Sequence, residues 1–445
     1  MTHSSMTGLR ALNELTLVHP DAATTIFNLE DYRVLETQIL DYGRRRILIE
    51  STVESGCPGC GVIGTRCHSR RVQGVRDIPV AGPVEVLWRK RRYFCDETLC
   101  ERKTFSEATV EVPARARSTR RLHGALVDAV ISSGRAATET AIAHGVSWWL
   151  VQKALTMAAT KLPNVDLLRP RMLGIDEHRF RSVRFFKNTE TNAWQRIEPW
   201  MTTIVDLDTG QILGVVDGRD HAGVGAWLIK RPLEWRLGVQ VVAIDPSAAF
   251  RKALRMWLPR TAVSVDHFHL IQLANQALTE VRQQLSHKVR GRRGRAADPA
   301  WAHRMLLLRA ADSLSENARA RLEKVFATDD ATGKLRTAWD VKEQVRALLR
   351  TGSLEDAELA KEDLERLVKE SNQPETTRLW RTICRWWTEI EVLIVTGATT
   401  SKVEANNTSI KHIKRTGRGF VNSTNYTTRI MLRSAARTAV NHPLQ

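Results

Sequence analysis

Two aspartates end predicted strands in the middle of the chain. Asp176 closes the apolar run at residues 172–177, and Asp245 closes another at residues 239–245. Open α/β sheets place their reactive groups at the carboxyl ends of such strands, so the two carboxylates are expected to be neighbours. Neighbouring unpaired carboxylates repel and favour divalent cations. Two such cations can stabilise both oxygens of a phosphodiester displacement. The alternative for Asp245, which precedes Pro-Ser, is a helix cap.

Glu404 is the candidate third acid of this site. If residues 401–416 are helical, Glu404, Thr408, Lys411 and Arg415 fall on one face of the helix. A carboxylate beside a row of cations suits metal binding next to DNA phosphates. The alternative is a solvated amphipathic face.

Five of the six cysteines lie within a short stretch near the N-terminus. Cys57 and Cys60 form one knuckle, and Cys95 and Cys100 form a second about 35 residues later. Two such pairs can close a tetrahedral site, so a structural Zn²⁺ is predicted. Cys67 and His68 are candidate substitute ligands. The alternative is ordinary reduced cysteines in a reducing cytosol.

The two aspartates need a sheet to hold them, and the middle of the chain predicts one. A turn at residues 208–210 joins two strands of a hairpin, and a helix at 222–230 precedes a buried parallel strand. The predicted strands are residues 172–177, 200–206, 211–216, 239–245 and 261–266. Three antiparallel strands, a helix and two strand–helix units is the order of an RNase H-like sheet. Asp266 follows the fifth strand, whereas such sites draw their second acid from the fourth, which favours Asp245.

Residues 137–155 have the pattern of a helix-turn-helix. Gly145 supplies the turn, and Ser147 caps the second helix. The residues that would face outward on that helix are Trp148, Trp149, Gln152 and Lys153. The alternative is a plain helical hairpin. A basic run just upstream, at residues 115–121, favours DNA binding.

The charge balance points to a polyanionic partner. The 445 residues include 67 Lys+Arg against 49 Asp+Glu, for a net charge of +18. Such a surplus favours nucleic acid. The alternative is a basic protein that binds none. No apolar run reaches the roughly 18 residues that span a bilayer, and the N-terminus does not resemble a secretory signal. The predicted DNA-binding residues are Arg91, Arg92, Arg115, Arg117, Arg120, Arg121, Trp148, Gln152, Lys153, Lys411, Lys414 and Arg415.

These motifs together resemble the ISL3 family of bacterial insertion-sequence transposases. The resemblance rests on the two knuckles, on LGIDE at residues 173–177, AIDPS at 243–247, VDHFHL at 265–270, and on EANN with IKHIKR and GF at 404–420. It runs in order over roughly residues 30–435.

The resemblance implies a DDE catalytic triad of Asp176, Asp245 and Glu404 holding two Mg²⁺ ions, with Mn²⁺ as a substitute. Asp266, His267 and His269 would then be supporting residues. It also implies cleavage and transfer of double-stranded DNA at the terminal inverted repeats and target, without a covalent intermediate. The expected enzyme is at least a homodimer on paired ends, works in the bacterial cytoplasm on the nucleoid, and has no membrane partner.

The expected fold is multidomain α+β. It comprises a zinc-ribbon-like β domain, a helix-turn-helix, and an RNase H-like catalytic domain that a helical insertion interrupts. The predicted segments are an N-terminal segment (1–50), the zinc domain (51–110), the helix-turn-helix (111–165), the first catalytic part (166–285), the insertion (286–395), the final catalytic helix (396–435) and a tail (436–445). Residues 287–299 are predicted to be a linker or loop. The alternatives are a zinc and helix-turn-helix regulator without nuclease activity, and a transposase that has lost activity.

Overall fold

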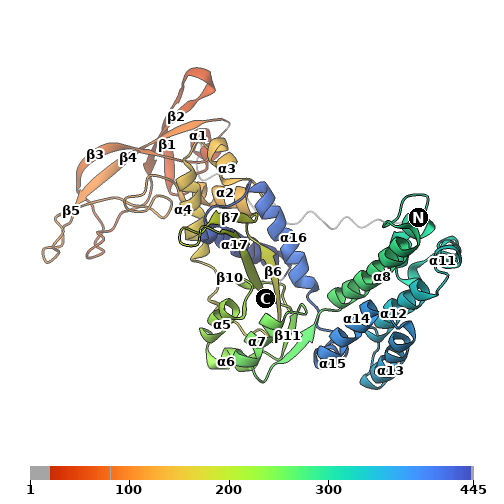
Figure 1. Cartoon of the computed structure of the whole chain (residues 1–445). Coiled ribbons are helices and arrows are strands. Elements are labelled where there is room, and N and C mark those ends of the chain that lie inside the picture. The colour runs from red at the N-terminus through yellow and green to blue at the C-terminus, as the bar shows by residue number, and fades with distance from the viewer. Residues whose placement is uncertain (1–20, 81, 442–445) are drawn as a thin grey trace, which may run out of the picture. The chain divides into compact units, whose positions relative to one another are not determined.

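The computed structural model describes residues 21–80 and 82–441, and these form two compact units. Unit 1 runs to Lys161 and includes Thr416–Arg418, and unit 2 comprises Leu162–Arg415 with the residues from Gly419 onward (Figure 1). Among the described residues, no helix is both long and apolar enough to cross a membrane.

Unit 1 is built on a five-stranded sheet with the order β1-β2-β4-β3, in which β5 pairs with β4. Ile49 and Trp88 are paired in this sheet and fully buried. The predicted boundary at residue 50 is therefore wrong, because β1 and β2 share the sheet and core of the strands that follow. The strands are β1 (Tyr32–Ile39), β2 (Arg45–Ser51), β3 (Cys67–Val75), β4 (Val84–Phe94) and β5 (Thr104–Ser106).

Two arginines of unit 1 are held by buried carboxylates. Arg91 Nε lies 3.0 Å from Glu107, which is fully buried. Arg121 Nε donates to Asp77 Oδ1 at 2.9 Å, and Asp77 is also buried. Removing one partner of such a pair leaves an uncompensated buried charge, so loss of either partner alone should destabilise the fold strongly. Both guanidiniums are thus engaged within unit 1, and contact of Arg91 or Arg121 with DNA stays a prediction.

Helices complete unit 1. The Ser147 hydroxyl accepts from the amide of Leu150 and caps α4, and Gly145 has a φ of +61° in the turn before it, as predicted. Trp149 and Lys153 are exposed on α4, whereas Trp148 and Gln152 are half-buried. The helices are α1 (Ala22–Phe27), α2 (Arg120–Ile131), α3 (Ala137–Ala143) and α4 (Trp148–Ala159).

Unit 2 contains a five-stranded sheet with the order β10-β9-β6-β11-β12. β6 is antiparallel to β9 and parallel to β11, which is parallel to β12. The strands are β6 (Met172–Arg179), β9 (Trp200–Asp206), β10 (Ile212–Asp217), β11 (Val241–Ile244) and β12 (Ala262–Val265). All five strands occur where the sequence predicted them, which fixes the edge at which the aspartates lie. The helices between them are α5 (His221–Ile229), α6 (Leu233–Gly238) and α7 (Ala248–Trp257).

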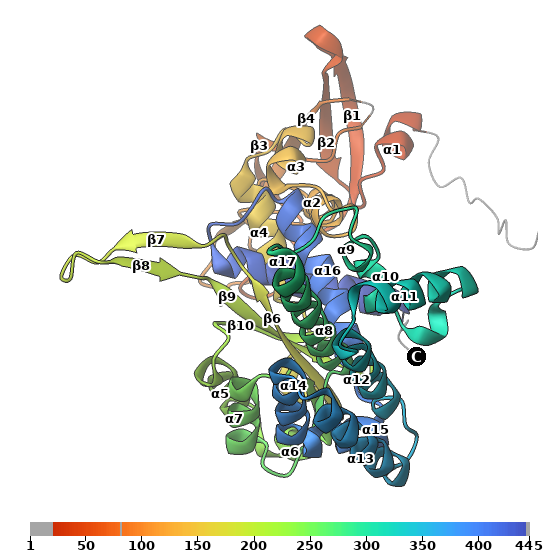
Figure 2. The ribbon, with the colours of Figure 1, turned by 45° about the vertical axis from the view of Figure 1, so that its right-hand side comes forward.

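A two-stranded ribbon, not predicted from the sequence, separates β6 from β9. It consists of β7 (Arg184–Lys187) and β8 (Trp194–Ile197), and Figure 2 shows it projecting from the sheet.

The helical insertion shares a hydrophobic core with the sheet of unit 2. Val345, Ile383 and Trp386 are buried in one cluster with Ile175 and Ile244. Trp386 thus packs locally, beneath the guanidinium of Arg251. The helices are α8 (His267–Arg290), α9 (Pro299–Ala302), α10 (Arg304–Leu308), α11 (Glu316–Asp329), α12 (Lys334–Leu348), α13 (Leu354–Ser371), α14 (Pro374–Arg385) and α15 (Trp387–Thr396).

Two predicted boundaries in unit 2 are corrected. Helix α8 runs to Arg290 and ends at Gly291, with a φ of +65°, so the predicted linker at 287–299 begins four residues later. The last helices are α16 (Ser401–Thr416) and α17 (Ser423–Asn441). Because α17 continues past residue 435, only residues 442–445 of the predicted tail lie outside the described residues.

Candidate active site

Three aspartates lie side by side at the carboxyl end of the parallel strands. The fully buried residues Ile175, Ile244 and Val265 occupy one row of the sheet. Asp176, Asp245 and Asp266 follow these residues directly. The strand register therefore brings the two predicted acids together and adds Asp266 beside them.

Helix α16 brings Glu404 to this row. Val403 packs so closely on Gly174 of β6 that a Cβ there would lie 2.4 Å from its Cγ2. Lys402 Nζ donates to Leu207 O at 2.6 Å, which anchors the first turn of the helix. The Glu404 carboxylate then lies in one cluster with Asp266 and His269, with ligand atoms within 4.8 Å of one another.

Asn407, one turn after Glu404, is a site residue that the sequence reasoning missed. Its Nδ2 donates to Asp176 Oδ2 at 2.6 Å, and its side chain is buried on α16. The only signal for it was its place in the EANN motif. Because this bond joins α16 to β6, Asn407 orients the carboxylate of Asp176.

Asp176 and Asp245 are neighbouring carboxylates that share His269 as the nearest cationic side chain, and of the two it contacts only Asp245, at Oδ2. Burial, followed by the nearby charge of Asp176, raises the pKa of Asp245 to about 8. Burial likewise raises the pKa of Asp176. Asp245 Oδ1 is buried and has no hydrogen-bond partner among the described residues. A pair of close carboxylates with a free inward oxygen fits a divalent cation, because hard cations prefer such oxygen ligands.

Asp266 differs from Asp176 and Asp245, because hydrogen bonds within the protein already occupy both of its carboxylate oxygens. Burial acts to raise its pKa, but hydrogen bonds from His269 and from the backbone of Thr400 outweigh burial and hold the pKa at about 2. Its Oδ1 accepts from Thr400 N at 3.1 Å, and its Oδ2 accepts from Phe268 N at 3.0 Å, which caps α8. Asp266 thus has a structural role, because its bonds join the end of β12, the first turn of α8 and the segment before α16.

His269 lies between Asp245, a candidate metal ligand, and Asp266, which is hydrogen-bonded within the protein. Its Nε2 lies 3.1 Å from Asp245 Oδ2, and its Nδ1 lies 3.4 Å from Asp266 Oδ2. The hydrogen bond with Asp266 raises the pKa of His269. His267 is half exposed, and its Nδ1 is 4.0 Å from Asp266. His269 is therefore the histidine that touches the candidate metal ligands.

The raised pKa of Asp245 predicts a pH-dependent stability in EDTA. The folded protein keeps this proton up to about pH 8, because the pKa of Asp245 is raised to about 8, whereas the unfolded chain loses it near 3.8, the ordinary pKa of an aspartate. Stability from this group therefore falls as the pH rises between these values. Relative to wild type, Asp245→Asn should gain at least about 1 kcal/mol between pH 5 and pH 8. Thermal unfolding of both proteins at the two pH values measures this gain, and an equal difference at both would contradict it.

Asp266→Ala should have the opposite effect on stability. The variant loses the α8 cap and leaves the Thr400 amide unpaired, which costs about 2 kcal/mol or more. Thermal unfolding at pH 7 in EDTA should show a lower midpoint for Asp266→Ala and a higher one for Asp245→Asn. A midpoint for Asp266→Ala equal to that of wild type would refute its structural role.

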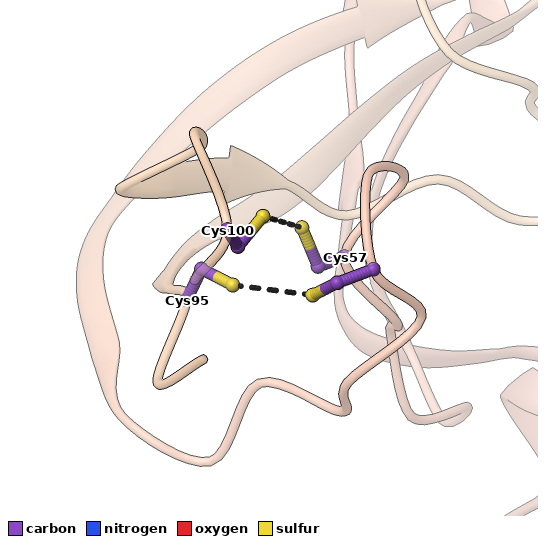
Figure 3. Close-up of side chains that lie close together, drawn as sticks. Cys57, Cys95 and Cys100 are labelled. Atoms are coloured by element: carbon purple, nitrogen blue, oxygen red, sulfur yellow. Dashed lines mark hydrogen bonds between the residues drawn. The ribbon is translucent and has the colours of Figure 1, made fainter. Parts of the chain in front are cut away.

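The four predicted cysteines come together in unit 1 as a second candidate metal site, and Figure 3 labels Cys57, Cys95 and Cys100. Cys57 Sγ lies 3.9 Å from Cys100 Sγ, and Cys60 Sγ lies 3.5 Å from Cys95 Sγ. Four thiolates at zinc-bonding distance in a tetrahedron are about 3.8 Å apart. A backbone hydrogen bond from Gly59 lowers the pKa of Cys57 to about 6, which favours the thiolate that binds metal. The cluster therefore fits a structural zinc site.

The substitute ligands lie outside this cluster. Cys67 is exposed, and its Sγ contacts Ser69 O at 3.6 Å. His68 packs against Phe94 and lies 3.0 Å from the Ser69 hydroxyl. The alternative that either residue replaces a knuckle cysteine therefore has no geometric support.

The basic residues that the sequence predicts to bind DNA lie mainly on two surfaces. In unit 1, Arg115, Arg117, Arg120 and Lys153 line an open hollow of about 690 Å³ together with Trp149. In unit 2, Lys411 and Arg415 are exposed on the α16 face that carries Glu404 and Thr408. Lys414 is half-buried and donates to Arg179 O at 2.9 Å. Arg92 is exposed and bonds Thr104.

Comparison with known proteins gives two family matches. A model of the ISL3-type DDE family, described as transposase, matches residues 173–430. A second, described as the zinc finger of the transposases of IS204, IS1001, IS1096 and IS1165, matches residues 54–100.

The chain is also similar to a curated relative from two strains of Mycobacterium tuberculosis, the transposase for insertion sequence element IS1557. The identity is 24% over 251 residues, which is 51% of this chain and 55% of the relative. The chain thus spans about half the length of these relatives.

The longer family match covers more than half of the chain and includes all the acids described above, and the shorter one covers the four-cysteine cluster. The protein therefore belongs to the ISL3 family of DDE transposases.

Proposed function

We propose that this protein is a DNA transposase that cleaves the ends of an insertion sequence and joins them to target DNA. The observation that carries the proposal is the pair Asp176 and Asp245, half-buried and adjacent, with one oxygen of Asp245 unpartnered among the described residues. Family membership supports the same reaction class.

Asp176, Asp245 and Glu404 are proposed to hold two Mg²⁺ ions, for which Mn²⁺ can substitute. Bound there, the ions would activate the attacking oxygen and stabilise the leaving oxygen of the phosphodiester. Asn407 keeps Asp176 oriented, and His269 keeps Asp245 in place. Asp266 is assigned as a positioning residue, because both of its oxygens are already bonded within the protein.

An RNase H-like fold for unit 2 agrees with this assignment. The sheet order and the mixture of antiparallel and parallel pairs support it, with the acids on β6 and directly after β11. The insertion α8–α15 then separates the last strand from the helix that carries Glu404.

Unit 1 and the basic face of α16 are proposed to bind double-stranded DNA. Helices α3 and α4 would act as a helix-turn-helix, with Trp148, Gln152 and Lys153 toward the major groove. Arg92, Arg115, Arg117 and Arg120 would contact phosphates, as would Lys411, Lys414 and Arg415. Such an enzyme would pair two DNA ends as a dimer or larger oligomer, on the nucleoid in the bacterial cytoplasm.

Asn407→Ala should lower strand cleavage about 10- to 100-fold, because residues that orient a metal ligand have effects of this size. The loss should appear mainly as a higher Mg²⁺ requirement, measured by titrating Mg²⁺ in a cleavage assay. Asn406→Ala is the matched control, since Asn406 bonds Gly210 O rather than an acid. If Asn407→Ala cleaved DNA with an unchanged Mg²⁺ requirement, Asn407 would have no role in orienting a metal ligand.

The proposed function is tested with purified protein and a plasmid that carries the inverted repeats flanking its gene. Mg²⁺-dependent breaks that leave 3′-OH groups at the repeat ends are expected, and they should be absent in EDTA. Sequence-specific binding without any break would instead support the alternative of a DNA-binding regulator.

A further inference from the structure

We propose that the β7–β8 ribbon binds DNA bases that are unpaired or drawn out of the duplex next to the cleavage site. Its aromatic side chains would stack on bases while its cations contact phosphates. This inference rests on the proposed function, since it assigns a further DNA contact to the same enzyme.

All eight strand residues of the ribbon are exposed. Phe185 is 60% exposed and Trp194 is 70% exposed. Among the described residues, no ring contact or cation–π pair involves either side chain. Large aromatic groups left in water next to each other mark an interaction surface rather than a core.

The strand register places these aromatic groups with cations on one face. Phe185 pairs with Arg196, and Lys187 pairs with Trp194. Directly paired residues point to the same side of a ribbon, and so do residues two apart along a strand. One face therefore presents two aromatic rings, each opposite a cation. Aromatic rings beside cations are the combination that binds single-stranded nucleic acid with little sequence preference.

Charge along the ribbon favours a polyanion over an apolar protein partner. Residues 179–200 include five cations, Arg179, Arg181, Arg184, Lys187 and Arg196, against two acids, Glu190 and Glu198.

The basic surface continues from the ribbon toward the acids. At the ribbon base, Arg179 and Arg219 flank the Trp200 ring at 5.0 and 4.7 Å from its centroid. An open hollow there of about 320 Å³ is lined by Arg196, Glu198, Trp200, Gly218 and Arg219, and Glu198 forms ion pairs with Arg179 and Arg196. Arg219 also lies 3.8 Å from Glu177, the neighbour of Asp176. Three arginines against two acids, Glu177 and Glu198, therefore leave a net positive surface between the ribbon and the candidate active site, along which a strand can run.

The test uses the full-length protein and two DNA probes, a fully paired duplex and the same duplex with a short unpaired segment that contains 2-aminopurine. Phe185→Ala and Trp194→Ala should each weaken binding to the unpaired probe about tenfold or more, while binding to the paired duplex changes less than twofold. Quenching of 2-aminopurine by the wild type should also be lost. Lys187→Gln and Arg196→Gln should each reduce the salt dependence of binding, with a change in log–log slope of about 0.7.

Leu237→Ala is the matched control, because Leu237 is a 55% exposed apolar residue on α6, away from the ribbon. Ribbon variants that bind both probes like wild type would overturn the inference, and so would variants that only convert a dimer to a monomer. If the wild type still cleaves DNA in those cases, the proposed function stands. A wild type that neither binds nor cleaves DNA would refute both.

Discussion

Asp245→Asn is expected to lower Mg²⁺-dependent strand cleavage by about a thousandfold or more and to leave DNA binding intact. Asp245 Oδ1 is buried and has no hydrogen-bond partner among the described residues, which supports the proposal that Asp245 holds a cation. Loss of a catalytic metal removes several kcal/mol of transition-state stabilisation, and each 1.36 kcal/mol corresponds to a factor of ten. Cleavage of an end-labelled duplex under single-turnover conditions measures the loss, and gel retardation in EDTA measures binding.

Asp208→Asn is the control for this variant, because Asp208 lies in the β9–β10 turn and pairs with Arg171 rather than with the acids. Asp176→Asn and Glu404→Gln should resemble Asp245→Asn. Cleavage by Asp245→Asn within tenfold of wild type would reject Asp245 as the second acid and make Asp266 its replacement.

Cys57→Ser is expected to abolish zinc binding and to unfold the region around the knuckles. Structural zinc contributes about 10–16 kcal/mol to the folding of small domains. The cluster of Cys57, Cys100, Tyr93 and Phe105 is separate from the core formed around Ile49 and Trp88. The damage should therefore stay local: limited proteolysis should cut within residues 54–66 and 95–104, while unit 2 stays intact. Zinc content should fall from one ion per chain to nearly none.

Cys67→Ser and Cys384→Ser are the controls, because both cysteines are exposed and lie outside the cluster. They should keep zinc and protease resistance. A Cys57→Ser protein with full zinc content, or a wild type that contains no zinc, would contradict the structural site.

The strands that carry the acids were predictable because their apolar runs are local signals. Residues 172–177 and 239–245 read as strands from sequence alone. In the structure Asp245 directly follows β11 as predicted, whereas Asp176 lies within β6, because pairing with β9 carries that strand on to Arg179. The four cysteines were equally predictable from their spacing. In each case, the sequence immediately around the functional residue is enough to predict the element that carries it.

The features that the sequence did not reveal depend on long-range contacts or on exposed positions. Asn407 has no pattern of its own, and its role appears only where α16 crosses Gly174. The pairing of β2 with β4 joins residues nearly 40 positions apart, which a local reading cannot show. The ribbon was missed because both of its faces are exposed, so no apolar alternation marks it. Basic residues near Arg290 suggested a loop, although Gly291 was a helix end signal.

The most direct test of the central claim is to locate Mn²⁺ by anomalous diffraction from crystals of the full-length protein soaked at pH 8. A peak in contact with the carboxylates of both Asp176 and Asp245 is predicted, and it should disappear in Asp245→Asn. A peak confined to Asp266, His269 and Glu404, or no peak in this region, would contradict the assignment of Asp176 and Asp245 as the catalytic pair.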